Sequence, residues 1–303
     1  MIVNTGLLEA GLRSEFFARY AAMEALWPRF CMTVQSNLPV EIYRWLGAPP
    51  MMRQWIGDRQ PQGLRTESYS VENEDYEATM EVKGNELDDD QTGQINIRVN
   101  ELAEAAKTYP DYLRSLLLEN GANAGFNSYD GVTFFNDAHV SGDSGSQDNN
   151  LTSAAADGTT PSTLEMKAAI NNGVAVLTSF KNDKGQPANL QRSGVVVEVP
   201  WNMEQVAREA ATAAMLNNAT NVMLTSVEVV VNQWLTSLDR FYISITGGVI
   251  KPFIMQTRRQ LQFKSVAEND AKAAFNRRYQ YGVDARFKVA YGAWFKCVRH
   301  VFT

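Results

Sequence analysis

The chain has 303 residues, of which 45% are hydrophobic and 20% are charged, which is enough apolar material for one elaborated domain or two ordinary ones. No apolar run is long enough for a membrane-spanning helix, and the first residues lack the basic head of a secretory signal. A net charge of −6 argues against a dedicated nucleic-acid binder, but it suits a container whose inner wall must not adhere to a packed polyanion.

The first segment predicts an amphipathic helix that is capped by Thr5, starts at Gly6 and ends before Pro28. Its apolar side chains recur about every four residues, at Leu8, Leu12, Phe16, Tyr20, Met23 and Trp27. This face could pack on the core of its own chain or on a neighbouring copy, and the sequence leaves both possibilities open.

A strand pair is predicted next. Residues 31–60 are interrupted by prolines and are expected to be extended and irregular. From Arg65 to Lys83 the pattern has period two, so we expect Thr66–Val71 to pair with Tyr76–Lys83 across a polar turn at 72–75. Because an isolated two-stranded hairpin is marginal in water, this hairpin would need a partner surface.

The stretch Glu41–Asp90, which contains this hairpin, also carries Trp45 and Trp55. It has no nucleophile, metal cluster or phosphate loop. Large aromatic side chains beside a projecting polar hairpin indicate a surface that grips other chains. This stretch therefore favours assembly over catalysis.

The rest of the chain alternates predicted helices and strands. Residues 93–107 and 111–119 are helical, with a kink or break at Pro110 and an end at Gly121. A Ser-, Asp- and Gly-rich loop is predicted over Asn136–Pro161. The later predictions are helices at Ser162–Phe180, interrupted at Asn171–Gly173, and from Asn202 to about Leu216, and strands at Val195–Val199, Val227–Val231, Phe241–Ile245, Phe253–Gln256, Leu261–Val266, Tyr279–Phe287 and Lys288–Val301. The mixture indicates an α+β fold.

The search for catalytic residues is negative. The two histidines, His139 and His300, do not stand beside a nucleophile in a recognised arrangement. A metal site from Asp130, Asp137 and His139 is conceivable, but it lacks a second histidine. A polar loop pinned by the two phenylalanines that precede His139 explains the same residues.

Other polar clusters also lack a functional pattern. Asp88–Asp90 and the loop aspartates do not have EF-hand spacing, and the basic pairs at 258–259 and 277–278 suit ion pairs on an acidic protein. Cys31 and Cys297 are expected to be free, buried thiols. We therefore predict that the chain is not an enzyme and has no catalytic residue, cofactor or metal.

A family resemblance rests on the collinear order of many short segments. They are Tyr43–Gly47, Trp55–Arg59, Tyr69–Val71, Tyr76–Glu77, Glu86–Asp90, Leu116–Gly121, Tyr129–Phe135, Asp137–His139, Lys251–Arg259, Tyr281–Gly282 and Tyr291–Trp294. In this order the sequence resembles the major head subunit family of Mu-like phages, which has the Hong Kong 97-type fold of tailed-phage major capsid proteins.

The resemblance implies four parts: an N-terminal arm over 1–56, an extended hairpin loop over 57–84, a peripheral domain with a spine helix over 85–161 and 251–303, and an axial domain over 162–250. It implies a shell of hexamers and pentamers in the virion, assembled in the bacterial cytoplasm around double-stranded DNA that is contacted non-specifically. It further implies a portal, a separate scaffolding protein and a possible decoration protein as partners, and no membrane.

The expected assembly contacts are Leu12, Phe16, Trp45, Trp55, Tyr69, Tyr76, Met80, Lys83, Arg258 and Arg259. Some relatives crosslink covalently through a loop lysine, and Lys83 is the lysine of the predicted hairpin. We nevertheless expect non-covalent locking in this chain. The alternative interpretations are an encapsulin-like nanocompartment that encloses protein cargo and a soluble acidic enzyme that uses the loop Tyr129–His139.

Overall fold

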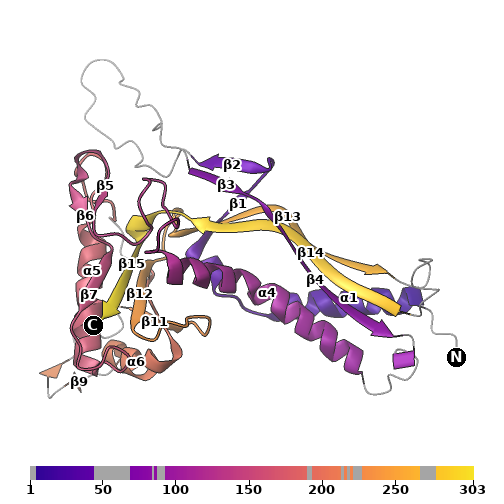
Figure 1. Cartoon of the computed structure of the whole chain (residues 1–303). Helices are drawn as coiled ribbons and strands as arrows, with labels where there is room; N and C mark the ends of the chain where they lie inside the picture. Colours follow the sequence, from indigo (N-terminus) through magenta and orange to yellow (C-terminus); the bar gives the residue numbers. More distant parts are fainter. Residues whose placement is uncertain are drawn as a thin grey trace, which may run out of the picture.

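The structure, a computed structural model, describes residues 5–43, 69–83, 85–86, 93–189, 193–212, 215–216, 219–220, 227–266 and 278–303. These residues form two units (Figure 1). The long unit extends to one side as a narrow sheet with two helices beneath it, and the compact unit lies at the other end and contains the C-terminus. No helix in the part of the chain described is both long and apolar enough to cross a membrane.

The long unit is a four-stranded sheet covered on one face by two helices. The strand order is β1 (Cys31–Gln35), β13 (Phe253–Val266), β14 (Arg278–Tyr291) and β4 (Glu74–Lys83). β1 runs parallel to β13, and the other pairs are antiparallel. Helices α1 (Thr5–Ala22) and α4 (Gln94–Asn120) pack on each other and on the sheet.

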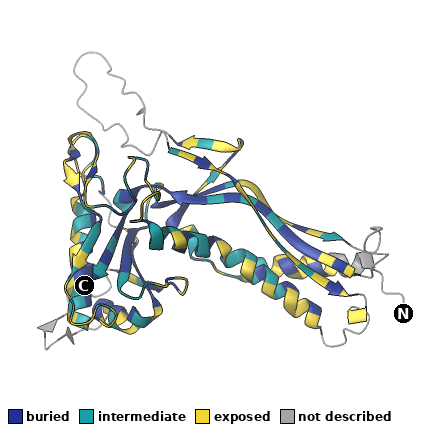
Figure 2. Cartoon of the chain, in the orientation of Figure 1, coloured by how far each residue is buried: buried dark blue, intermediate teal, exposed yellow. Residues whose placement is uncertain are grey.

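Alternation along β4 and β14 explains this arrangement. Every second residue is buried or half-buried toward the helices, and the residues between them are mostly exposed or half-exposed, as Figure 2 shows by the alternating colours of these strands. A strand with period two buries one face and exposes the other. The long unit therefore has an apolar inner face and a polar outer face.

The compact unit is a five-stranded sheet with two helices. The strand order is β11 (Glu228–Val231), β8 (Val195–Val199), β12 (Arg240–Ile245), β15 (Cys297–Phe302) and β7 (Asn150–Ser153). Helices α5 (Thr163–Ser179) and α6 (Glu204–Thr212) pack on each other, and both contact this sheet. Each residue of β8 is buried, and the largest cluster of buried side chains lies here and reaches the base of the long unit.

Short elements complete the described chain. A two-stranded ribbon of β2 (Val40–Tyr43) and β3 (Tyr69–Glu72) lies above the long sheet in Figure 1. The remaining elements are α2 (Trp27–Phe30), β5 (His139–Val140), η1 (Gly142–Ser144), β6 (Ser146–Gln147), η2 (Trp201–Met203), β9 (Met215–Leu216), β10 (Ala219–Thr220) and η3 (Trp294–Lys296).

The predicted strand pairing of the hairpin is wrong. β3 pairs with β2, and β4 pairs with β14. The physical reason is length: β14 offers β4 ten paired positions and an apolar face beside Tyr281 and Val283, which a short strand at 66–71 could not provide. The alternation of β4 was read correctly, but its partner lies about 200 residues further along the chain.

Several boundaries also differ from the predictions. The first helix ends at Ala22, and Trp27–Pro28 begin the separate helix α2, where proline fits the first turn. Helix α4 is continuous through Pro110. Helix α5 is likewise continuous through Gly173. The lack of a side chain there lets the helix lie close to β12, since a Cβ atom at 173 would lie 2.4 Å from Cδ1 of Ile243.

Other differences concern loops and long strands. The predicted loop over 136–161 contains β5, η1, β6 and β7. The helix expected from Asn202 is η2 followed by α6, which ends at Thr212. The strands predicted at 253–256 and 261–266 form one continuous strand, β13. The strand predicted at 288–301 is divided between β14, which ends at Tyr291, and β15, which lies in the other sheet. The strand at Val195–Val199 and the α+β class are as predicted.

Candidate assembly surfaces

The described residues hold no cluster of three or more His, Cys, Asp or Glu side chains that could bind a metal ion. His139 is fully buried; its Nδ1 lies 2.6 Å from Oδ2 of Asp130, and its Nε2 lies 3.2 Å from the carbonyl oxygen of Phe134. Its ring stacks on Trp294 with a centroid distance of 4.0 Å. This arrangement fixes the loop before β5.

The outer face of the long sheet carries paired charges. The Asp284 carboxylate lies 2.7 Å from both Arg259 and Lys264, and Arg278 lies 2.8 Å from Glu81. The ribbon of β2 and β3 packs on the base of this face, where Tyr43 and Val71 contact Ile254 and Ala290, while Arg259, Lys264 and Arg278 are 42%, 64% and 55% exposed. Because exposed pairs are worth little to the stability of a chain, these charges can be separated at little cost.

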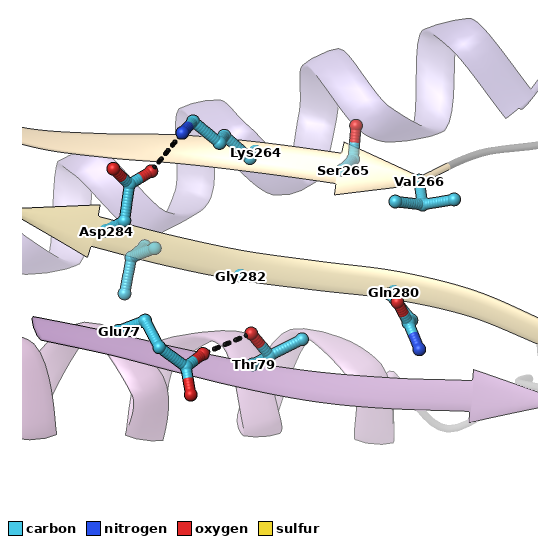
Figure 3. Close-up of a pocket in the computed structure, with 9 residues that line it drawn as sticks. Glu77, Thr79, Lys264, Ser265, Val266, Gln280, Gly282 and Asp284 are labelled. Atoms are coloured by element: carbon cyan, nitrogen blue, oxygen red, sulfur yellow. Dashed lines mark hydrogen bonds and ion pairs between the residues drawn. The ribbon is translucent and has the colours of Figure 1, made fainter. Parts of the chain in front are cut away.

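A hollow lies in the middle of this charged face (Figure 3). Gly282 is one of the residues that line it. A Cβ atom at this position would lie 2.8 Å from Oγ1 of Thr79, so a larger residue would force a neighbour to shift. The hollow has a volume of about 320 Å³. Lys264 turns toward Asp284 at one end, and Thr79 donates to Glu77 across a 2.7 Å hydrogen bond on the neighbouring strand.

A second charged cluster lies at the junction of the two units, and it is buried. Arg114 of α4 donates two hydrogen bonds to Glu198 of β8, of 2.8 Å and 2.5 Å, and both side chains are almost fully buried. Asn232 donates to the same carboxylate at 2.6 Å. The guanidinium also lies 4.3 Å from the ring centre of Phe30. These contacts fix the long helix against the compact sheet.

The segment around α2 passes over the same junction. Asp111 accepts hydrogen bonds from the backbone N–H groups of Leu26 and Trp27, and Arg29 pairs with Glu228 of β11. The Cys31 thiol beside the cluster is buried, and burial raises its pKa to about 12, so it stays protonated and unreactive. Burial also raises the pKa of Cys297 to about 12. Both cysteines are free and buried, as predicted.

Two of the expected assembly residues lie inside the chain. Leu12 and Phe16 are buried in the core between α1, α4 and the long sheet, and Phe16 packs on Phe263 at a centroid distance of 5.5 Å. The expectation that they face a neighbouring subunit is therefore corrected, because their apolar surface is already covered by α4 and β13.

The other expected residues lie in three settings. Tyr69, Tyr76 and Met80 are half-buried, and the Tyr76 ring contacts Phe287 and Tyr109. Lys83 and Arg258 are exposed, and Arg258 donates to the carbonyl oxygen of Ser36 at 3.3 Å. Arg259 belongs to the charged face. Trp45 and Trp55 lie outside the described residues.

The sequence reasoning missed the buried junction. Its signal is present in the strand Val195–Val199, where Glu198 is the one charged residue among four valines. A carboxylate in a fully buried strand needs a cationic partner. The partner, Arg114, lies on a helix 84 residues away, so the sequence could predict that a partner exists but not which residue it is.

Comparison with known proteins gives one family. The family model described as Mu-like prophage major head subunit gpT matches residues 6–166 and 237–300. The major capsid protein of Escherichia phage Mu is 28% identical over 142 residues, which are 46% of this chain and 46% of that protein. The Mu-like prophage FluMu major head subunit of Haemophilus influenzae is 23% identical over 290 residues, or 95% of this chain and 70% of that protein. The match thus spans about half the length of the phage Mu relative.

Solved structures share the fold. The procapsid of bacteriophage JBD30 has a TM-score of 0.60 at 21% identity, over 99% of this chain and 76% of that chain. The mature capsid of bacteriophage PhiM1 has a TM-score of 0.60 at 10% identity, over 93% and 88%. The virus-like particle from Pyrococcus furiosus has a TM-score of 0.56 at 8% identity, over 96% and 98%. At these identities the likeness establishes the α+β fold of tailed-phage major capsid proteins.

Proposed function

The chain belongs to the Mu-like prophage major head subunit family, and on that premise we propose that it assembles into hexamers and pentamers of an icosahedral shell that encloses double-stranded DNA. The observation that carries this proposal is the family match over both ends of the chain, including α1, α4 and most of the long sheet. The shell would be part of a virion and would assemble in the bacterial cytoplasm.

The surfaces of the long unit support a shell. The outer face of the sheet carries exposed charges beyond the part that the β2–β3 ribbon covers, and the last strand, β4, has no second neighbour among the described strands. The ribbon of β2 and β3 pairs with no further strand in the described part of the chain, and it exposes Val40 and Ile42. These surfaces differ from one another, and unlike donor and acceptor surfaces give head-to-tail contacts that close into rings.

We also propose the four-part division for this chain, with adjusted boundaries. The pairing of β2 with β3 supports a projecting hairpin whose base is at Val40–Glu72, while β4 belongs with the peripheral sheet. Helix α4 is the candidate spine helix. Strands β7 and β15 join the five-stranded sheet, so the axial part would draw strands from both sides of residues 162–250.

The proposed partners are a portal, a separate scaffolding protein, a possible decoration protein and the packaged DNA. Locking between subunits is proposed to be non-covalent. Membership of a structural capsid family supports a role without catalysis. A large precursor domain cleaved from the subunit during assembly would contradict the separate scaffolding protein.

The function is tested by electron microscopy of the purified protein at rising concentration. Capsomers, tubes or shells are the expected result, whereas monomers at high concentration would contradict the proposal and favour the soluble enzyme. Likeness to a virus-like particle keeps the nanocompartment as the second candidate. Nuclease-protected DNA inside particles isolated from induced cells supports the phage shell, and protein cargo without DNA supports the nanocompartment.

A further inference from the structure

The chain turns from the β2–β3 ribbon into the long sheet at a single buried residue. Asn73 is the one residue between β3 and β4, and it is 5% exposed. Its side-chain amide donates hydrogen bonds of 2.9 Å to the Ser36 hydroxyl and to the carbonyl oxygen of Leu38, and its backbone N–H donates to the carbonyl oxygen of Pro39 at 3.0 Å. Asn73 therefore ties the end of β3 to the segment that precedes β2.

A fully buried glutamine of the long sheet binds the same ribbon. Gln256 of β13 is 0% exposed. Its Oε1 accepts a hydrogen bond of 2.7 Å from the Tyr43 hydroxyl, and its Nε2 donates to Oδ1 of Asn73 at 2.9 Å and to the carbonyl oxygen of Val71 at 3.2 Å. These partners fix the orientation of the amide, because a flipped amide would bring its oxygen against two acceptors. One side chain thus binds both strands of the ribbon and the turn that follows them.

Apolar packing between the ribbon and the sheet is limited. The buried apolar cluster between them has five members, which are Met32, Tyr43, Val71, Ile254 and Ala290. A hollow of about 350 Å³ is lined by residues of β3 and of the end of β14. Burial of apolar surface has no preferred direction, whereas a hydrogen bond weakens steeply when its angle changes, and a buried amide that loses its partners is costly. The hydrogen bonds, more than the packing, therefore select one direction for the ribbon.

We propose that Gln256 and Asn73 form a latch that fixes the direction of the β2–β3 ribbon relative to the long sheet in the unassembled subunit, so that ribbon and sheet move as one body. Gln256 is a positioning residue, since it holds the ribbon through Tyr43, Val71 and Asn73. The consequence for assembly rests on the proposed shell function: a ribbon that is already fixed loses less conformational freedom when another chain docks, so the latch should favour assembly.

Distances between two spin labels measure the direction of the ribbon in the unassembled subunit. The labels are attached at Ile42→Cys on the ribbon and at Lys264→Cys on the sheet, which are exposed positions, whereas the native cysteines are buried. The otherwise unchanged subunit should give one narrow distance distribution. Gln256→Met, which has a similar shape but no amide, should broaden it to about twice that width or more. Gln262→Met, the same substitution at an exposed position of β13, is the matched control and should leave the width unchanged.

Hydrogen exchange separates a latch from a general contribution to stability. In Gln256→Met, the amides that pair β2 with β3 should exchange about tenfold faster, because a two-stranded ribbon without a supporting surface is marginally stable. The amides that pair β8 with β12 in the compact unit should keep their rates. Tyr43→Phe removes one hydroxyl and keeps the ring in its apolar cluster. It should have the same effect to a smaller degree, and it replaces Gln256→Met if that variant does not fold.

Three outcomes would overturn the proposal. The first is an unchanged distance distribution in the folded Gln256→Met and Tyr43→Phe variants, and the second is a broad distribution in the otherwise unchanged subunit. The third is equally faster exchange in the ribbon and in β8, or loss of folding in both variants, which would mean that the network supports the whole subunit. None of these readouts requires assembly. A latch confirmed in a subunit that never forms particles would therefore contradict the shell function alone, and normal particles from a subunit without a latch would contradict the latch alone.

Discussion

A buried and an exposed cluster of charge in the described part of the chain have opposite consequences for stability. At the junction, the Arg114 and Glu198 side chains are 0% and 1% exposed, and every contact of their carboxylate is internal. On the outer face, Arg259 and Lys264 are 42% and 64% exposed around Asp284. A buried pair fixes one geometry because separation of its charges is costly, whereas an exposed pair can be exchanged at little cost.

The comparison separates two roles of charge in a shell subunit. The angle between its long and compact units has to be held within one chain, and the buried junction provides this. On the outer face the cations are solvated, since Arg259 and Lys264 are 42% and 64% exposed beside Asp284, so separating these charges should cost little. Stability of the single chain should therefore depend strongly on the junction and weakly on the outer face.

The largest expected effect is that of Glu198→Ala. Removal of the carboxylate leaves the Arg114 charge buried without its partner, which should lower the free energy of unfolding by about 3–5 kcal/mol. Urea unfolding of the unassembled subunit measures this. The double variant Arg114→Met/Glu198→Leu, which removes both charges, should recover most of the loss, and Glu81→Ala on the exposed face is the matched control. A loss below about 1 kcal/mol would contradict the account of the junction.

The next effect concerns acid, and it belongs to the compact unit. Burial lowers the pKa of His300 from its ordinary 6.5 to about 4; its Nε2 lies 2.7 Å from the Ser153 hydroxyl. As the pH falls from 6.5 to 4, the unfolded chain takes up a proton at this residue before the folded chain does, so stability decreases across that window. The two and a half pKa units correspond to a loss on the order of 3 kcal/mol.

Unfolding of the wild type and of His300→Gln at pH 7, 5.5 and 4.5 measures this effect. The variant should have a shallower slope between pH 6.5 and 4 than the wild type, because it lacks the group that titrates. Equal slopes would show that His300 does not contribute to the acid sensitivity of the subunit.

The smallest effect is expected on the outer face. Asp284→Asn removes the carboxylate between Arg259 and Lys264, and the unfolding free energy should change by no more than about 1 kcal/mol. This change in unfolding free energy should be smaller still in about 0.5–1 M salt, because exposed charges are well screened at these concentrations. A loss comparable to that of Glu198→Ala would remove the distinction between the two clusters.

Local sequence patterns predicted many of the helices and strands, but they did not predict which distant segments pair. The β-branched run at 195–199 predicted β8, and the alternation at 76–83 predicted β4. The partner of β4 could not be read, because period two specifies a strand and its buried face but not the neighbour. Helix α4 continues through Pro110, where tertiary packing outweighs a local breaker.

The candidate surfaces were predicted less well for a related reason. Leu12 and Phe16 form an apolar stripe, and a stripe does not reveal whether the covering surface belongs to the same chain. The structure places α4 and the long sheet over it. A pocket lined by Ala78, Ala106 and Ala285 could not be predicted from the sequence, because Ala78 and Ala285 come together only through the pairing of β4 with β14.

Sedimentation velocity of the purified subunit, with electron microscopy of the same fractions, tests the central claim most directly. The account predicts a concentration-dependent shift from subunits to capsomers and closed shells, with Glu198→Ala reducing the folded subunit available and Asp284→Asn leaving it nearly unchanged. A folded, stable subunit that remains monomeric at every concentration and salt condition, with and without co-expressed scaffolding protein, would contradict it.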